Sequence, residues 1–199
     1  MAESVGTVTI LRASTYRATR WKNGGGETLE IASSPSGAGL DRFDWRISVA
    51  TVAIDGPFSR FTGVDRTLCI LSGAGIVLQI DDEPARQLDT ASDPFAFSGD
   101  AAAHATLIEG AVTDFNVMTR RGRFRQHVER IRLRSGDARE LRADVHVVMC
   151  HAGAVSLEAA TARDSLGPMD TLLRAPSDLN VYQLVAKSPT TIYFVKILS

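Results

Sequence analysis

The fold is decided by residues 65–78, which read DRTLCILSGAGIVL: a short apolar strand, a turn of small residues and a second strand. Upstream, residues 43–49 alternate apolar side chains at odd positions with polar ones at even positions, which is typical of a half-buried strand. Gly, Pro, Asp and Ser separate many such strands, and no segment has the period of a long amphipathic helix. We therefore predict a mostly β fold with strands at Val8–Leu11, Thr28–Ala32, Leu68–Leu71, Ile76–Ile80, Ala105–Ile108, Phe115–Met118, Val145–Cys150, Val155–Leu157 and Thr191–Ile197.

The second half of the chain repeats the pattern of the first. Residues 144–157, DVHVVMCHAGAVSL, carry the apolar columns of residues 65–78 at an offset of 79 positions. Two later pieces correspond at an offset near 77, residues 94–100 with 171–177 and residues 114–118 with 191–195. An internal duplication is favoured, and a chance alignment of two β patterns is the alternative because few identities survive.

Strand, small-residue turn, strand and then a Gly-Asp turn into another hairpin is the rhythm of a jelly-roll barrel. Its duplication predicts an all-β bicupin, whose halves we place at residues 1–120 and 121–199. In the second half Pro176-Ser177 replaces Gly99-Asp100, and Val145 aligns with Arg66. In the second half the polar positions are thus replaced, while the aligned apolar positions stay apolar. We therefore expect the functional site in the first barrel and a degenerate second barrel packed on it.

The composition excludes several classes of protein. The 199 residues are 44% hydrophobic and 23% charged with a formal net charge of −1, so no general attraction to nucleic acid or to an anionic membrane is expected. Cys69 and Cys150 lie in apolar runs and are expected to be buried thiols rather than a disulfide. No apolar stretch reaches about 18 residues and no signal-peptide pattern begins the chain, so we expect a soluble cytoplasmic protein without a membrane partner.

Six blocks follow one another in the first 120 residues: WKNGGGET (21–28), FDWRIS (43–48), DGPFS (55–59), VDRT (64–67), FSGD (97–100) and DFNVM (114–118). In this order they resemble the HutD/Ves family, and the WKNGGG block is the most specific of them. The resemblance implies a cupin-like fold of RmlC-like barrels and an association with histidine utilisation. It informs the fold more than the function, and the rest of the chain is similar only in layout.

The strand before the small-residue turn carries no histidine. Metal-binding cupins place a His-x-His pair and a Glu on that strand and another His on a later hairpin, a donor set that suits a divalent transition metal. Here His104 stands alone, and the odd separation of His146 from His151 indicates opposite faces of a strand. We therefore expect no metal and no other cofactor.

The block Trp21–Gly26 contains three consecutive glycines, more than an average turn needs, because each Gly costs about 1 kcal/mol of backbone freedom. It lacks the Gly-Lys-Ser/Thr ending of a phosphate-binding loop. We interpret it as a turn that contacts a ligand, with a flexible turn as the alternative. The contacts expected from it are Trp21, Lys22, Asn23, Gly24 and Gly25.

Two arginines are the main candidates for binding an anion. Arg46 shares the polar face of its strand with Ser48, and Arg66 begins the central strand. The planar guanidinium group matches a carboxylate through two parallel hydrogen bonds. Solvation at the surface is the usual role of a single arginine, and these two are preferred because both lie in the family-like blocks. The other pocket residues expected on the same grounds are Phe97, Asp114 and Asn116.

Candidates for acid/base catalysis are present, although nothing in the sequence demands catalysis. The chain has no Gly-x-Ser-x-Gly elbow and no Cys-His spacing that indicates a nucleophile. Glu27, Asp55, Asp100 and Asp114 fall in the resembling blocks, but Asp55 and Asp100 are also ideal turn residues. We lean towards a binding protein and leave an enzyme open.

Residues 120–142 hold nine arginines against three acidic residues, a local net charge of +6. A single aromatic residue, Phe124, interrupts the run, whereas binders of single-stranded nucleic acid use aromatic platforms on which bases stack. We interpret the run as a solvated connection between the halves or as an interface between subunits of a homodimer, and we expect no nucleic-acid partner.

Three functions stay open. The leading one is a metal-free bicupin that binds a small molecule with one or two carboxylates near Arg46 and Arg66, in a regulatory or accessory role in histidine utilisation. The second is a metal-independent enzyme that acts on such a metabolite by acid/base chemistry, and the third is a structural or partner-binding protein. The two arginines indicate that the ligand is an anion. The choice of formylglutamate as an example of such a ligand rests on the family resemblance alone.

Overall fold

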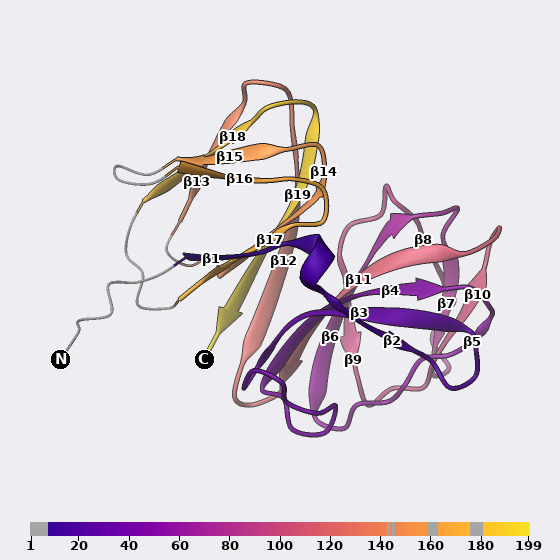
Figure 1. Cartoon of the computed structure of the whole chain (residues 1–199). Helices are drawn as coiled ribbons and strands as arrows, with labels where there is room; N and C mark the ends of the chain where they lie inside the picture. The colour runs from indigo at the N-terminus through magenta and orange to yellow at the C-terminus, as the bar shows by residue number, and fades with distance from the viewer. Residues whose placement is uncertain (1–7, 143, 145, 159–162, 176–180) are drawn as a thin grey trace. The chain divides into compact units, whose positions relative to one another are not determined.

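Antiparallel strands make up nearly all the regular structure in residues 8–142, 144, 146–158, 163–175 and 181–199, which are those that the computed structural model describes (Figure 1). One 3-10 turn, Ala13–Thr15, is the helical structure among them. No helix in these ranges is long and apolar enough to cross a membrane. The predicted all-β fold is confirmed.

The chain divides into two compact units. The first barrel comprises residues 16–126 with the last two residues, and the second comprises residues 127–197 with the N-terminal segment up to Thr15. This division differs from the expected halves at 1–120 and 121–199. Strand β1 (Val8–Leu11) pairs with β17 (Thr171–Arg174), and its Val8 and Ile10 pack on the apolar cluster of the second barrel. Pairing with a sheet edge depends on hydrogen bonds and burial, not on nearness in sequence, so the pattern of β1 did not reveal its partner.

The first barrel consists of two antiparallel sheets with an apolar core between them. The larger sheet has the order β2 (Arg17–Arg20), β3 (Gly26–Ser34), β4 (Trp45–Val52), β11 (Val112–Arg120), β6 (Val64–Ser72), β9 (Phe95–Ser98). The smaller has the order β5 (Gly56–Pro57), β10 (Ala103–Leu107), β7 (Ile76–Ile80), β8 (Arg86–Leu88).

The second barrel repeats this strand order. Its sheets are β1-β17-β14-β19-β12 and β13-β18-β15-β16. The four strands β17-β14-β19-β12 reproduce β9-β6-β11-β4 of the first barrel, and β13-β18-β15-β16 reproduce β5-β10-β7-β8. Strand β1 is an addition at the sheet edge of the second barrel, as β2 and β3 are in the first. The predicted duplication is therefore present in the topology. The strands that complete this barrel are β12 (Arg125–Leu133), β13 (Ala138–Leu141), β14 (Val147–Ala152), β15 (Val155–Glu158), β16 (Arg163–Leu166), β18 (Tyr182–Ala186) and β19 (Thr190–Leu198).

A bulge in each barrel corrects the predicted alignment of the repeats. Leu71 is the extra residue where β6 pairs with β11, and His151 is the extra residue where β14 pairs with β19. When these bulges are superposed, Arg66 corresponds to His146 rather than to Val145. A shift of one residue exchanges the two faces of a strand, so the correction decides which side chains face inward. Val145, Pro176 and Ser177, which the sequence comparison used, lie outside the described residues.

Candidate functional site

The interior of the first barrel contains a cavity of about 530 Å³. Its wall on the larger sheet is formed by Arg46 and Ser48 of β4, Arg66 of β6, and Asp114 and Asn116 of β11. Alternate residues of a strand share a face, and β4, β11 and β6 are neighbours, so their polar side chains meet on one side of the sheet. All five are at most 8% exposed. The structure thus brings together polar residues that the sequence analysis had proposed separately.

Loops at the rim of the cavity supply more exposed contacts. Trp21, Lys22 and Asn23 come from the connection between β2 and β3, and Leu40 comes from the connection between β3 and β4. Leu40 is 54% exposed and Lys22 is exposed. Phe58, which follows β5, closes the opposite side. The cavity therefore has a charged wall, an aromatic wall and a cation at its rim.

Arg66 is one of two buried arginines that line this cavity, the other being Arg46. Its Nε donates a 2.7 Å hydrogen bond to Asn116 Oδ1, and its Cζ lies 4.5 Å from the ring centroid of Phe58 and 5.5 Å from that of Phe97. Its Nη groups donate no hydrogen bond to any residue that the structure describes. Burial lowers the pKa of Arg66 to about 10, which leaves it charged at neutral pH. Phe97 does not line the cavity but helps to orient this guanidinium group.

Asp114 is a carboxyl group enclosed in the same cavity. Burial raises its pKa to about 7, although the charge of Arg66 and the hydrogen bond from Asn116 act in the opposite direction. Asn116 Nδ2 donates to Asp114 Oδ1, and the same amide accepts from Arg66 through its oxygen. Asp114 therefore changes its protonation state near neutral pH beside a fixed cation.

Arg46 is neutralised within the protein. Its Nε donates to Glu30 Oε2 at 2.7 Å, and its Nη1 donates to Ser48 Oγ at 3.3 Å. Glu30 also lines the cavity, and sequence reasoning missed it. The available signal was its place beside Thr28 on the polar face of a predicted strand, but it lies outside the family-like blocks. Arg46 is therefore less available to an anion than Arg66.

The three glycines serve the backbone of the β2–β3 turn. A Cβ on Gly26 would lie 2.1 Å from the carbonyl oxygen of Thr51, and one on Gly25 would lie 2.6 Å from Ile54 Cγ1. Gly24 has a φ of +71°, which disfavours other residues. Gly24 and Gly25 do not line the cavity, whereas their neighbours Lys22 and Asn23 do.

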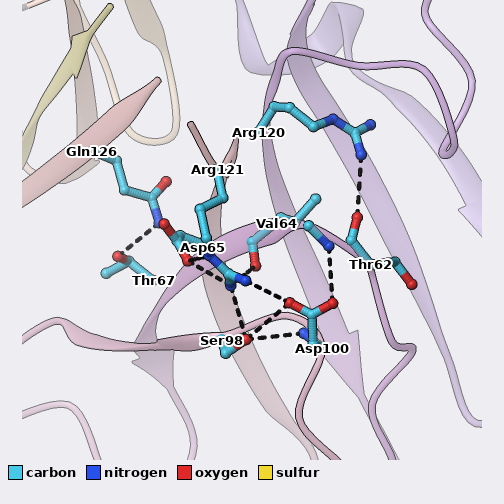
Figure 2. A network of polar contacts seen from close by, with 10 residues as sticks. Thr62, Val64, Asp65, Thr67, Ser98, Asp100, Arg120, Arg121 and Gln126 are labelled. Carbon is cyan, nitrogen blue, oxygen red and sulfur yellow. Dashed lines mark hydrogen bonds and ion pairs between the residues drawn. The ribbon is translucent and has the colours of Figure 1, made fainter. Parts of the chain in front are cut away.

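Two of the other three acidic candidates of the first barrel, Asp55 and Asp100, hold turns. Asp100 accepts a 2.9 Å hydrogen bond from the Gly63 backbone and a 2.8 Å hydrogen bond from Arg121 Nη1, of which Figure 2 shows the contact with Arg121. The backbone bond is the main reason that the pKa of Asp100 is lowered. Asp55 accepts from the Leu107 backbone at 2.8 Å. Glu27 lies on β3 but outside the cavity lining. Asp114 is the candidate among the four that lines the cavity.

The beginning of the arginine-rich run is part of the first barrel. Arg120 donates to the carbonyl oxygens of Thr62, Asp41 and Phe43. Arg121 bridges Asp65 and Asp100 (Figure 2), and Arg123 pairs with Asp44. These three arginines tie loops and strand ends of the first barrel together. Arg121 and Arg123 are solvent-exposed, as expected, but they belong to the first barrel rather than to a connection between the halves.

The described residues do not offer the donor set of a cupin metal site. No three His, Cys, Asp or Glu side chains of the described ranges come together as metal ligands. His104 is exposed on β10, and His146 Nδ1 accepts a 3.1 Å hydrogen bond from the Ile197 backbone. Cys69 and Cys150 are buried and are not joined in a disulfide, as predicted.

Comparisons of sequence find relatives with little functional description. The family model described as HutD matches residues 13–193. An uncharacterized 21.2 kDa protein in the hutC 3′ region of Pseudomonas putida is 42% identical over 120 residues, 60% of this chain and 62% of that protein. Protein Ves of Escherichia fergusonii is 45% identical over 101 residues, 50% of this chain and 51% of that protein. The chain thus spans between half and two thirds of the length of these curated relatives.

Solved structures resemble the chain over nearly its whole length. A conserved protein of unknown function from Pseudomonas aeruginosa PAO1 is 33% identical with a TM-score of 0.86, and the match covers 97% of this chain and 100% of that one. HutD from Pseudomonas fluorescens SBW25, in a formate condition, is 28% identical with a TM-score of 0.74 and the same coverage.

Proposed function

Since this chain belongs to the HutD family, we propose that its first barrel binds a small carboxylate metabolite at Arg66, in a regulatory or accessory role in histidine utilisation. Arg66 itself carries the proposal. It is 8% exposed, it lines the cavity, and among the described residues its Nη groups donate no hydrogen bond to the protein. A carboxylate is the natural partner because it accepts two parallel hydrogen bonds from one guanidinium group.

The surroundings of Arg66 favour a fixed orientation. Phe58 and Phe97 lie against the guanidinium group, and Asn116 holds its Nε edge. A guanidinium group that is held by aromatic rings and one hydrogen bond loses little freedom when it binds an anion. Arg66 therefore acts as a preorganised contact.

The cavity suits a compact ligand with a second polar end. A volume of about 530 Å³ lies within the usual range of small-molecule pockets. Lys22 at the rim offers a second cation, and Asn23 offers an amide. A dicarboxylate such as formylglutamate can place one carboxylate at Arg66 and the other near Lys22. Formate, the smallest carboxylate, tests the contact with Arg66 alone.

Isothermal titration calorimetry tests the proposal with formate and formylglutamate as ligands and with formamide as the uncharged control. We expect Arg66→Ala to weaken carboxylate binding by about 2–5 kcal/mol, which is roughly 30-fold or more. Arg66→Lys should also weaken it, because an ammonium group cannot reproduce a two-pronged contact.

Arg86→Ala is the matched control. Arg86 also lies over a phenylalanine, 4.8 Å from the ring centroid of Phe95, but it is exposed on β8 and outside the cavity lining. Its removal should leave affinity unchanged. An Arg66→Ala protein that folds and binds both acids as tightly as the wild type overturns the proposal.

A metal-independent enzyme is the second candidate, because Asp114 has a pKa of about 7 beside a buried cation. Such a carboxyl group is suited to general acid/base catalysis at neutral pH. We expect any turnover of a bound carboxylate, followed by proton NMR, to be lost in Asp114→Asn while binding persists. Stable ligand signals over hours in the wild type count against this candidate.

A further inference from the structure

Asn116 lies between two buried charges of the first barrel, Arg66 and Asp114. Its Oδ1 accepts from Arg66 Nε and its Nδ2 donates to Asp114 Oδ1. An amide makes both contacts in one orientation only, with its oxygen towards the arginine and its nitrogen towards the carboxyl group. Asp114 therefore contributes charge to the cavity without occupying the Nη groups of Arg66.

The charges that face Asp114 can be counted element by element. Strand β6 contributes Arg66, β4 contributes Arg46, β3 contributes Glu30, and the β2–β3 turn contributes the exposed Lys22. The lining residues on and after β5, among them Phe58, are uncharged. Because Arg46 is paired with Glu30, the buried charges that remain are one cation, Arg66, and one carboxylate, Asp114.

A bound carboxylate upsets this balance. It places a second anion beside one available buried cation, and two carboxylates that share an enclosed site do not both stay ionised. One of them must take up a proton. The ligand contacts Arg66 directly, whereas Asp114 reaches the arginine only through the Asn116 amide, so Asp114 is the group that becomes neutral.

We propose that a carboxylate binds at Arg66 together with one proton, which is taken from solvent by the carboxyl group of Asp114. No bond of the ligand changes, and the charge of the cavity is the same before and after binding. Neutral Asp114 still accepts from Asn116 and gains an O–H donor for the ligand. This inference rests on the proposed function and adds that the site responds to pH as well as to ligand concentration.

In the protein without ligand, the carboxyl group of Asp114 is already partly protonated near neutral pH. Burial raises the pKa of Asp114 to about 7, so protonation costs little near neutral pH. Above that pH each unit makes the proton about tenfold harder to acquire, and the apparent affinity for a carboxylate should fall by the same factor.

Calorimetry with formate in two cationic amine buffers of different ionisation enthalpy, triethanolamine and Tris at pH 8, measures the protons taken up without adding a competing buffer anion. Formate is fully ionised there, so any uptake belongs to the protein. We expect nearly one proton per formate in the wild type and none in Asp114→Asn. The dissociation constant should rise about tenfold from pH 7.5 to 8.5 in the wild type and stay flat in the variant.

Two further measurements make the outcome decisive. Asp55→Asn removes an exposed carboxylate outside the cavity lining and should keep the proton uptake of the wild type. The carbon-13 shift of the Asp114 carboxyl group, followed with pH in the wild type, should show a higher pKa at saturating formate, so the test does not depend on the folding of a variant.

Failure of this inference and failure of the proposed function give different experimental results. Formate that binds the wild type at pH 8 without proton uptake, and with no change in the pKa of Asp114, overturns this inference and leaves the carboxylate site standing. Absence of carboxylate binding between pH 5.5 and 8.5 overturns the proposed function and this inference with it.

Discussion

The two barrels share a strand order but differ in what they enclose. At equivalent places on the paired central strands, the first barrel has Asp114 and Asn116, whereas the second has Ile192 and Phe194. Both apolar residues belong to the cluster that fills the second barrel, and each is at most 4% exposed. One duplicated topology thus carries polar side chains that line a cavity in the first barrel and buried apolar side chains at the equivalent positions of the second.

The buried arginines Arg174 and Arg66 also differ between the two barrels, in whether the protein supplies acceptors for their Nη groups. Arg174 Nη1 donates to the carbonyl oxygens of Leu141 (3.2 Å) and Arg142 (2.9 Å), and its Cζ lies 5.3 Å from the ring centroid of Tyr182. Arg66 also lies against aromatic rings, but its Nη groups donate to no described residue. A buried arginine stabilises a fold or binds a ligand according to whether the protein itself supplies the acceptors.

The largest effect is expected when the polar pattern of the first barrel is introduced into the second. Ile192→Asp places a carboxylate in an apolar cluster whose buried arginine, Arg174, already donates to two backbone carbonyl groups, so we expect a loss of stability on the order of 4 kcal/mol or more at pH 8. Urea unfolding followed by circular dichroism measures it, and Ile192→Val, at about 1 kcal/mol, is the control. A stable Ile192→Asp protein contradicts the description of Ile192 as part of a buried apolar cluster.

The next test removes each of the two buried arginines in turn and compares the effects on stability and on formate affinity. Arg174→Ala removes the donor of two backbone carbonyl groups and should cost about 1–3 kcal/mol of stability while leaving formate affinity unchanged. Arg66→Ala should weaken formate binding and cost less stability. Denaturant titrations and calorimetry on both variants measure these effects, and a ligand affinity that depends on Arg174 breaks the assignment of the site to the first barrel.

Asp114→Asn should stabilise the protein in a pH-dependent way. The pKa of this carboxyl group is raised in the folded state, so its stabilising contribution is present below about pH 4 and is lost as the pH rises to about 7. We expect the variant to melt a few degrees higher than the wild type at pH 8 and at nearly the same temperature at pH 4. Equal differences at both pH values would show that Asp114 titrates as an ordinary surface carboxylate.

The smallest expected effect is that of metal removal. Neither barrel brings three metal-ligating side chains together among the described residues. Treatment with EDTA should therefore change neither the melting temperature nor formate affinity, and elemental analysis should find no stoichiometric zinc, iron, nickel or manganese. One equivalent of metal whose removal abolishes binding contradicts this expectation.

Local patterns in the sequence were sufficient for much of the site. The alternation of polar and apolar residues places Arg46 with Ser48 and Asp114 with Asn116 on shared faces, and the structure brings both pairs to one cavity together with Arg66. The all-β class and the duplication follow from the same period of two and from turn residues, because both depend on near neighbours in the chain.

The tertiary structure alone decided what depends on partners distant in sequence. A bulge at His151 shifts the register by one residue, β1 pairs with β17 rather than within the first barrel, and Glu30 neutralises Arg46. The period of a strand states which residues share a face but not which strand lies beside it, nor which charge lies opposite. The availability of Arg66 and the raised pKa of Asp114 depend on those neighbours, so they appear only once the barrel is closed.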